Sequence, residues 1–283
     1  MRKSLILRAF LPLAVYGVFT ELALHGLAGI FMAVSGSWPG AESLELSAAV
    51  PWANAAAGLA AVGLFWKWYG CGGKAADGDS GPRLNLQRKK NGSFFLLIIL
   101  GFCCCLGGSG LISLLGEVFS GAVSSGSSSV EAISAGAKAA AAPGTAFPLF
   151  TLFFCSGCII PFVEEFLFRR AMYGSLRDVR SLGRAGALIL SSVIFGLYHG
   201  QLLQGLYAGL LGAVLACLYQ SGGSLAAPVA VHMSANLSAI VLEMARYGEW
   251  LEGSRSIRLV QTGAAVLSAV LILRSLCKTG SGR

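Results

Sequence analysis

Charged residues are scarce in this chain. Its 283 residues include 21 Lys or Arg and 13 Asp or Glu, which is 12% in all, whereas a soluble domain usually carries about 25%. Hydrophobic residues make up 55% of the sequence, and the mean hydropathy is +0.71. This composition excludes an ordinary soluble enzyme and predicts an all-α fold, a polytopic helical bundle in a membrane.

Several familiar motifs are also missing. The sequence has no G-x-S-x-G, no H-E-x-x-H and no phosphate-binding glycine loop, so no common nucleophile, zincin or nucleotide site is indicated. No basic stripe with interleaved aromatic residues is present, so nucleic acid is not an expected partner. The cysteines lie mostly in apolar runs and are interpreted as packing residues. Cys155 and Cys158 have redox or metal spacing, but no second pair accompanies them.

Apolar stretches long enough to cross a bilayer occur eight times, since a spanning helix needs about 20 residues. We treat the whole chain, 1–283, as one membrane domain. The N-terminal run is interpreted as an uncleaved first span, because Glu21 and His25 interrupt it and no clear cleavage site follows. The predicted spans are 9–35, 44–68, 93–119, 145–163, 185–203, 204–221, 224–243 and 257–277.

The basic residues are distributed unevenly between the two ends of these spans. If the N-terminus is cytoplasmic, 17 of the 21 Lys and Arg residues lie on the cytoplasmic side. The positive-inside rule therefore predicts that both termini are cytoplasmic. The long connections 70–92 and 120–144 are expected to be a basic cytoplasmic loop and a flexible outer linker, with no chemistry assigned to either.

Polar residues inside spans are expensive in hydrocarbon and are candidates for function. Glu165 and Arg169 have i, i+4 spacing, which places them on one helix face, while Glu164 is turned about 100° away from Glu165. His232 and Asn236 share the same spacing. The remaining candidates are His199, four residues after Phe195, and the pair Glu21 and His25, which is expected to be buried between helices.

Together these side chains supply a carboxylate, two imidazoles and a carboxamide from three spans. A carboxylate with a histidine can polarise a water molecule, and donors can stabilise a developing oxyanion. The set is therefore suited to hydrolysis by an activated water. Each residue alone also has a structural interpretation, as a membrane-boundary cluster or a hydrogen bond between helices.

The three patterns Glu164-Glu165-x-x-x-Arg169, Phe195-x-x-x-His199 and His232-x-x-x-Asn236 occur in order on successive spans. In this order they resemble the CPBP family of intramembrane proteases, which includes the type II CAAX prenyl endopeptidases and bacterial Abi-type proteins. The resemblance covers residues 145–243, the expected catalytic core. The first three spans resemble the family only in being apolar.

The resemblance implies a role for each matching position. Glu164 and His199 would activate a water for attack on a peptide bond, His232 and Asn236 would stabilise the oxyanion, and Glu165 and Arg169 would shape the site electrostatically. Members of the family have been described both as metalloproteases and as metal-free glutamate proteases. Both cofactor states therefore stay open: none, or Zn²⁺ bound by Glu164, His199 and His232.

These groups can meet only at a common depth. A rise of 1.5 Å per residue from the cytoplasmic side places His199 about 21 Å, His232 about 12 Å and Asn236 about 18 Å deep. Hydropathy would end the fourth span at 163 and leave Glu164 at the surface, so the site requires that helix to continue to about Tyr173. Glu164 then lies about 14 Å deep.

Two other classes of function fit the same polar residues. One is a membrane protein that binds a peptide toxin and protects its host without cleavage. The other is a proton-coupled transporter, although the repeats typical of transporters are not apparent. The favoured interpretation is an intramembrane endopeptidase acting on peptide or protein substrates in a bacterial cell membrane.

Overall fold

A computed structural model describes residues 2–35, 46–69, 92–119, 146–245, 247 and 254–278. Every regular element in these residues is a helix, and no strand occurs among them. Two of the elements, η2 and η3, are π-helices. In chain order the elements are α1 (Arg2–Ser35), α2 (Leu46–Tyr69), α3 (Gly92–Phe119), α5 (Ala146–Thr151), η2 (Leu152–Ile159), α6 (Ile160–Glu165), η3 (Phe166–Tyr173), α7 (Gly174–Leu176), α8 (Gly183–Tyr198), α9 (Leu202–Gly222), α10 (Ala226–Met244) and α12 (Arg255–Lys278).

Seven helical stretches in the described residues are long and apolar enough to cross a membrane, and α8 is a shorter apolar helix. This confirms the predicted all-α, polytopic membrane architecture. The stretch predicted over 185–203 is longer than α8, because the chain turns directly after Tyr198. At that turn Gly200 has a φ of 72°, a left-handed conformation that glycine adopts without a steric penalty.

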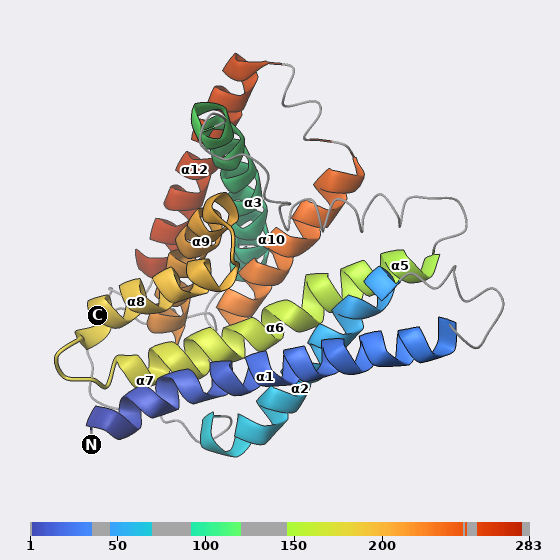
Figure 1. Ribbon diagram of the computed structural model, residues 1–283. Helices are drawn as coiled ribbons and strands as arrows, with labels where there is room; N and C mark the ends of the chain where they lie inside the picture. The colour runs from blue at the N-terminus through green and yellow to red at the C-terminus, as the bar shows by residue number, and fades with distance from the viewer. Residues whose placement is uncertain are drawn as a thin grey trace.

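The fourth span continues well past Val163. α5, η2, α6, η3 and α7 follow one another without a break from Ala146 to Leu176, and Figure 1 shows them as one long rod beside α1. The expected continuation to about Tyr173 is therefore confirmed. Because the rod extends this far, the two glutamates lie in its interior part rather than at its end.

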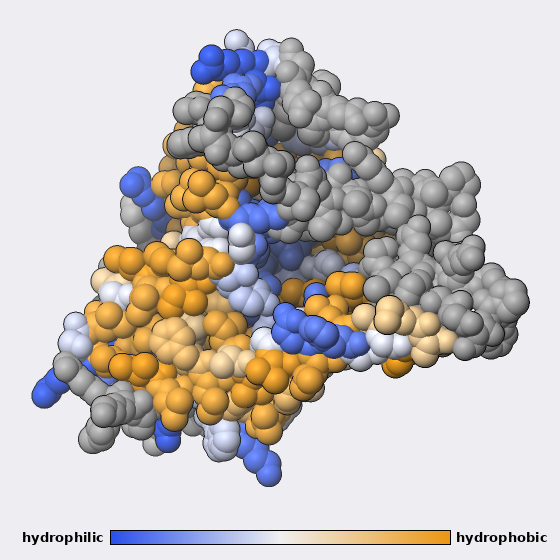
Figure 2. Space-filling model, viewed as in Figure 1, coloured by the Kyte–Doolittle hydropathy of each residue, from blue (hydrophilic) through white to orange (hydrophobic). Residues whose placement is uncertain are grey.

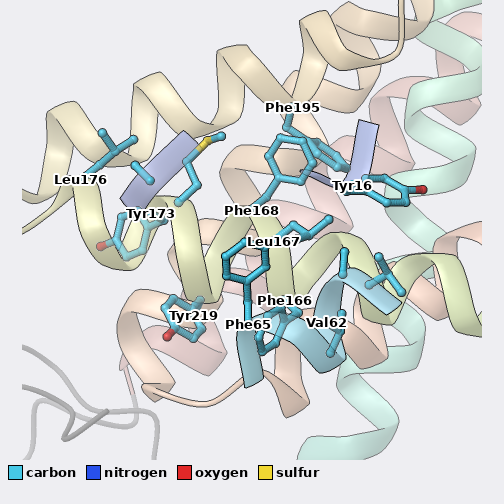
Figure 3. Close-up of a cluster of buried hydrophobic side chains, with 14 of the residues drawn as sticks. Tyr16, Val62, Phe65, Phe166, Leu167, Phe168, Tyr173, Leu176, Phe195 and Tyr219 are labelled. Atoms are coloured by element: carbon cyan, nitrogen blue, oxygen red, sulfur yellow. The ribbon is translucent and has the colours of Figure 1, made fainter. Parts of the chain in front are cut away.

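The helices pack around two apolar cores. The first contains Phe65 of α2, Phe166 and Phe168 of η3, and Phe195 of α8; Figure 3 shows these rings close together. The second joins α3, α9, α10 and α12, with Leu100 and Leu215 fully buried. Helix α9 contributes residues to both cores, so it joins the two halves of the bundle.

The contact between α8 and α9 depends on glycine. A Cβ atom on Gly196 would lie 2.5 Å from the carbonyl oxygen of Gly205 and 3.3 Å from Cα of Gly209. Gly200, four residues after Gly196, takes no part in this contact. It forms the turn after α8, and a Cβ atom added to it would have no neighbour within 4 Å.

The outer surface is largely apolar where α1 and α8 face the viewer in Figure 2. Val18 and Leu22 of α1 and Ile189 and Val193 of α8 are among the exposed apolar side chains of these two helices. The prediction that Glu21 and His25 are buried is wrong, because their side chains are 71% and 81% exposed. They still pair, with 3.7 Å between His25 Nδ1 and Glu21 Oε2, on a face of α1 that no other helix of the described residues covers.

Two predictions about loops fall outside the described residues. The connections 70–92 and 120–144 lie there, apart from Gly92, the first residue of α3. The cysteines in the described part of the chain that carry free thiols are Cys103, Cys104, Cys105, Cys155, Cys158 and Cys217.

Candidate active site

Five of the predicted polar residues come from three neighbouring elements. Glu164 and Glu165 are the last two residues of α6, Arg169 is in the middle of η3, and His232 and Asn236 lie one turn apart on α10. The glutamates, Arg169 and His232 are buried, each with no more than 6% of its surface exposed. Polar groups buried to this extent need partners, because each unpaired charge costs several kcal/mol.

Glu165 is held between two cationic or hydrogen-bonding groups. Its Oε2 lies 3.2 Å from Nε of Arg169, one turn along the same rod. Its Oε1 lies 2.9 Å from Nδ1 of His232 on α10. A carboxylate can only accept, so the hydrogen of this bond is carried by His232 Nδ1. The bond therefore fixes both the orientation of the imidazole and its tautomer when it is neutral.

Glu164 faces the opposite nitrogen of the same imidazole. Its Oε2 lies 3.6 Å from Nε2 of His232, which is longer than a direct hydrogen bond. His232 thus stands between the two adjacent carboxylates, which point in different directions from α6. The predicted division holds in geometry, since Glu165 pairs with Arg169 within its own rod and Glu164 does not.

Glu164, Glu165, Arg169 and His232 form one buried group, and its net charge indicates which chemistry it can support. Two carboxylates and one guanidinium leave one negative charge when His232 is neutral, and one bound proton makes the group neutral. Because net charge is expensive away from water, the group can take up one proton, which suits it to acid–base chemistry.

Phe195 organises the side chains around this group. The guanidinium carbon of Arg169 lies 4.5 Å from the centre of the Phe195 ring, in a cation–π contact. The ring also makes edge contacts with the imidazoles of His199 and His232, with centroids 4.9 and 5.8 Å apart. Arg169 Nη2 donates to the carbonyl oxygen of Gly212 on α9 at 3.3 Å.

His199 lies directly after α8 and is half-buried. Its Nδ1 is 2.8 Å from the carbonyl oxygen of Phe195, which can only accept, so Nδ1 carries the hydrogen and Nε2 presents a lone pair when the ring is neutral. The imidazole lies within electrostatic range of Glu164. A neutral His199 therefore has a basic Nε2, in a ring that lies near the Glu164 carboxylate.

Asn236 is tied to the π-helical part of the rod. Its side-chain amide donates to the carbonyl oxygen of Ser156 in η2 at 3.0 Å. A carboxamide has two N–H donors, so one remains for another acceptor. The bond fixes Asn236 on the side of α10 that faces the rod.

The structure adds two tyrosines that the sequence analysis did not single out. Tyr16 of α1 is 2% exposed, hydrogen-bonds through its side chain with Tyr198, and lies within electrostatic range of Glu164. The rings of Tyr198 and His199 are perpendicular, with centroids 5.8 Å apart. A tyrosine in an apolar helix gives no pattern, so only the packing of α1 against the rod could reveal Tyr16. Figure 3 shows Tyr16 beside Phe195 and Phe168.

A metal centre is not apparent in this arrangement. Within the described ranges, no group of three or more His, Cys, Asp or Glu side chains is placed to hold a metal ion. The suggested ligand set of Glu164, His199 and His232 does not form such a group in this structure. We therefore derive no chemical step through a metal.

Comparison with known proteins identifies the central part of the chain. Residues 146–238 match the family described as Rce1-like type II CAAX prenyl endopeptidases. A candidate membrane peptidase of Bacillus subtilis (strain 168), YdiL, is 29% identical over 97 residues, which is 34% of this chain and 39% of YdiL. The chain is thus aligned with less than half of that relative. No solved structure is significantly similar to it.

The matched residues include every side chain of the buried group and its neighbours Phe195, His199 and Asn236. Helices α1, α2, α3 and α12 lie outside the match and complete the bundle around it. Together with the seven apolar helices, the match indicates an integral membrane protein whose segment 146–238 is similar to the Rce1-like type II CAAX prenyl endopeptidases.

Proposed function

We propose that the protein is an intramembrane endopeptidase that hydrolyses peptide bonds with a water activated by Glu164 and His199. The observation that supports this most directly is the position of His232, with Nδ1 2.9 Å from Glu165 and Nε2 3.6 Å from Glu164. A buried imidazole between two carboxylates is too costly for packing alone. It occurs in the segment that matches an endopeptidase family.

In the first step, Glu164 accepts a proton from a water held between its carboxylate and Nε2 of His199. The hydroxide equivalent attacks the carbonyl carbon of the scissile bond, and the carbonyl oxygen becomes an oxyanion. The hydrogen bond from His199 Nδ1 to the carbonyl oxygen of Phe195 keeps Nε2 available for this role. Burial of Glu164 strengthens its interaction with the water, because competing solvent is excluded.

The oxyanion is then stabilised from α10. Asn236 uses one N–H on Ser156 and offers the other. His232 becomes a donor at Nε2 when it takes up the proton that Glu164 has received. When the oxyanion collapses to a carbonyl, the C–N bond breaks and this proton passes to the nitrogen of the leaving amine. Loss of one oxyanion donor typically costs about 10² to 10³ in kcat.

Glu165 and Arg169 position these groups and do not touch the substrate in this scheme. Glu165 orients His232 through Nδ1, and Arg169 balances the charge of Glu165 while packing on Phe195. The substrate class is a peptide or protein that reaches the site within the membrane. We propose that the protein lies in a bacterial cell membrane with both termini in the cytoplasm.

The test compares cleaved peptides in membranes from cells that express the wild type, Glu164→Ala, His199→Ala or Glu21→Gln. Glu21 is a matched control, since it is a glutamate in a span with an exposed side chain. Peptides that depend on the wild type should disappear in the two site variants. With a peptide identified in this way, the purified variants should be about 10² to 10⁴-fold slower.

Glu21→Gln should cleave like the wild type. Unchanged cleavage by both site variants would refute the assignment of the base. Protection from a peptide toxin that survives Glu164→Ala, with no cleavage product, would instead favour a binding function, and substrate accumulation in sealed vesicles that requires Glu21 would favour transport.

A further inference from the structure

Four apolar spans end at one pocket that the proposed catalytic site does not use. The stretches Leu5–Ile30, Ala49–Tyr69, Leu149–Leu176 and Leu202–Gly222 each have one end there. The pocket has a volume of about 210 Å³. Its lining at the span ends includes Leu5, Tyr69, Ser175 and Gly223.

The position of the pocket along the spans indicates the bilayer level at which it lies. Apolar spans end where hydrocarbon gives way to lipid headgroups. Trp68 also lines the pocket and is 70% exposed, and tryptophan is typical of this interfacial level. The pocket therefore opens at the height of the headgroups and beside the bilayer.

The charge of the lining is positive. Arg8, Arg170 and Arg177 contribute three guanidinium groups, and Asp178 is the one acidic residue among the described lining residues. Nε of Arg177 lies 3.8 Å from Oδ1 of Asp178, whose side chain is 60% exposed. An ion pair this exposed is weak, so the lining has an excess of positive charge that favours an anion.

The pocket is held in shape by hydrogen bonds between its helices. Arg170 donates from Nε to the carbonyl oxygen of Tyr69 and from Nη1 to the hydroxyl of Tyr219 at 3.4 Å. The Tyr69 hydroxyl donates to the carbonyl oxygen of Arg8 at 2.7 Å. These bonds connect α1, α2, η3 and α9, and they place the Arg170 guanidinium in the wall of the pocket.

We propose that this pocket binds the phosphate of an anionic membrane phospholipid, with the guanidinium groups of Arg8 and Arg177 as its principal contacts. Guanidinium matches phosphate in charge and in bidentate geometry. A lipid fits better than a soluble phosphate, because the acyl chains would run down the apolar helices from a pocket at the headgroup level. The site is independent of the proposed catalysis.

The test uses delipidated protein in an uncharged detergent and measures its melting temperature against short-chain phosphatidylglycerol, short-chain phosphatidylcholine and inorganic phosphate. Phosphatidylglycerol should raise the melting temperature in a saturable way, because a ligand that binds the folded state stabilises it. Phosphatidylcholine and inorganic phosphate should raise it much less. Arg8→Gln and Arg177→Gln should each weaken the phosphatidylglycerol effect by about fivefold in half-saturating concentration.

Arg180→Gln is the matched control, because Arg180 is an exposed arginine three residues from Arg177 and does not line the pocket. It should leave the half-saturating concentration unchanged. Equal stabilisation by the two lipids, or equal weakening by Arg180→Gln, would overturn the proposal. A full effect of inorganic phosphate that requires Arg8 would assign the pocket to a soluble phosphate and refute the lipid.

Discussion

The Nδ1 atom of His232 on α10 lies 2.9 Å from Oε1 of Glu165 on α6, across 67 positions of sequence. This bond turns the other nitrogen of the imidazole toward Glu164. One histidine therefore distinguishes two adjacent glutamates: Glu165 holds the ring, and Glu164 faces its other nitrogen.

The two glutamates should respond differently to the same substitution. Glu165→Gln leaves the buried Arg169 without its carboxylate, which typically costs about 3 to 5 kcal/mol, so the melting temperature in detergent should fall sharply. Glu164→Gln removes a base with little change of volume and should leave a folded, inactive protein. Thermal unfolding and turnover of the two variants check this, and a stable, inactive Glu165→Gln beside an active Glu164→Gln would exchange the two roles.

The Tyr16 and Tyr198 hydroxyls should act as one unit. Tyr16→Phe removes a hydrogen bond to Tyr198 near Glu164, and one such bond is worth about 1 kcal/mol. We expect each single Phe variant to lower kcat by about fivefold with KM little changed. The double variant should be no slower than either single one, because both remove the same bond. Multiplied effects in the double variant would contradict this coupling.

Gly196→Ala should destabilise the bundle. The added methyl group would lie 2.5 Å from the Gly205 carbonyl oxygen, so α8 and α9 would have to separate, at a cost of about 1 to 3 kcal/mol. Gly263→Ala in α12 is the control, since nothing lies within 4 Å of its added atom and alanine favours helix. The measurement is the melting temperature in detergent, which should fall for Gly196→Ala and stay equal or rise for Gly263→Ala.

The bundle should be oriented with the Arg177–Arg180 turn in the cytoplasm. This follows from the positive-inside rule and the 17 of 21 basic residues counted on that side. In intact cells, an impermeant thiol reagent should leave Asp178→Cys unlabelled and react with Ser254→Cys immediately before α12. The unsubstituted protein gives the background of its own thiols. Labelling of both positions from one side would rule out this topology.

Metal chelation should not change turnover. Among the described residues no three His, Cys, Asp or Glu side chains are placed to hold a metal ion, whereas a catalytic zinc usually has three protein ligands. Elemental analysis and an activity assay before and after chelation check this. Stoichiometric zinc whose removal abolishes cleavage and whose return restores it would make Glu164, His199 and His232 the ligands.

The sequence predicts the helices well because apolar length is a local property. It also pairs Glu165 with Arg169, since i, i+4 spacing is local too. The bond of Asn236 to Ser156 and the position of Tyr16 beside the site depend on how distant helices pack, which no spacing encodes. The same limit explains the error at Glu21 and His25: their pairing is local, but their burial depends on whether a second helix covers that face of α1.

The π-helical turns on both sides of α6 set where the rod tolerates a change of length. Deleting one residue from an α-helix rotates everything beyond it by about 100°. A π turn already holds a surplus residue, because its hydrogen bonds run from i to i+5, and it can lose that residue by returning to α-helical winding. Single-residue deletions within Leu152–Ile159 or Phe166–Tyr173 can therefore be absorbed locally. A single-residue deletion within Ile160–Glu165 would instead rotate the carboxylates of Glu164 and Glu165 away from His232.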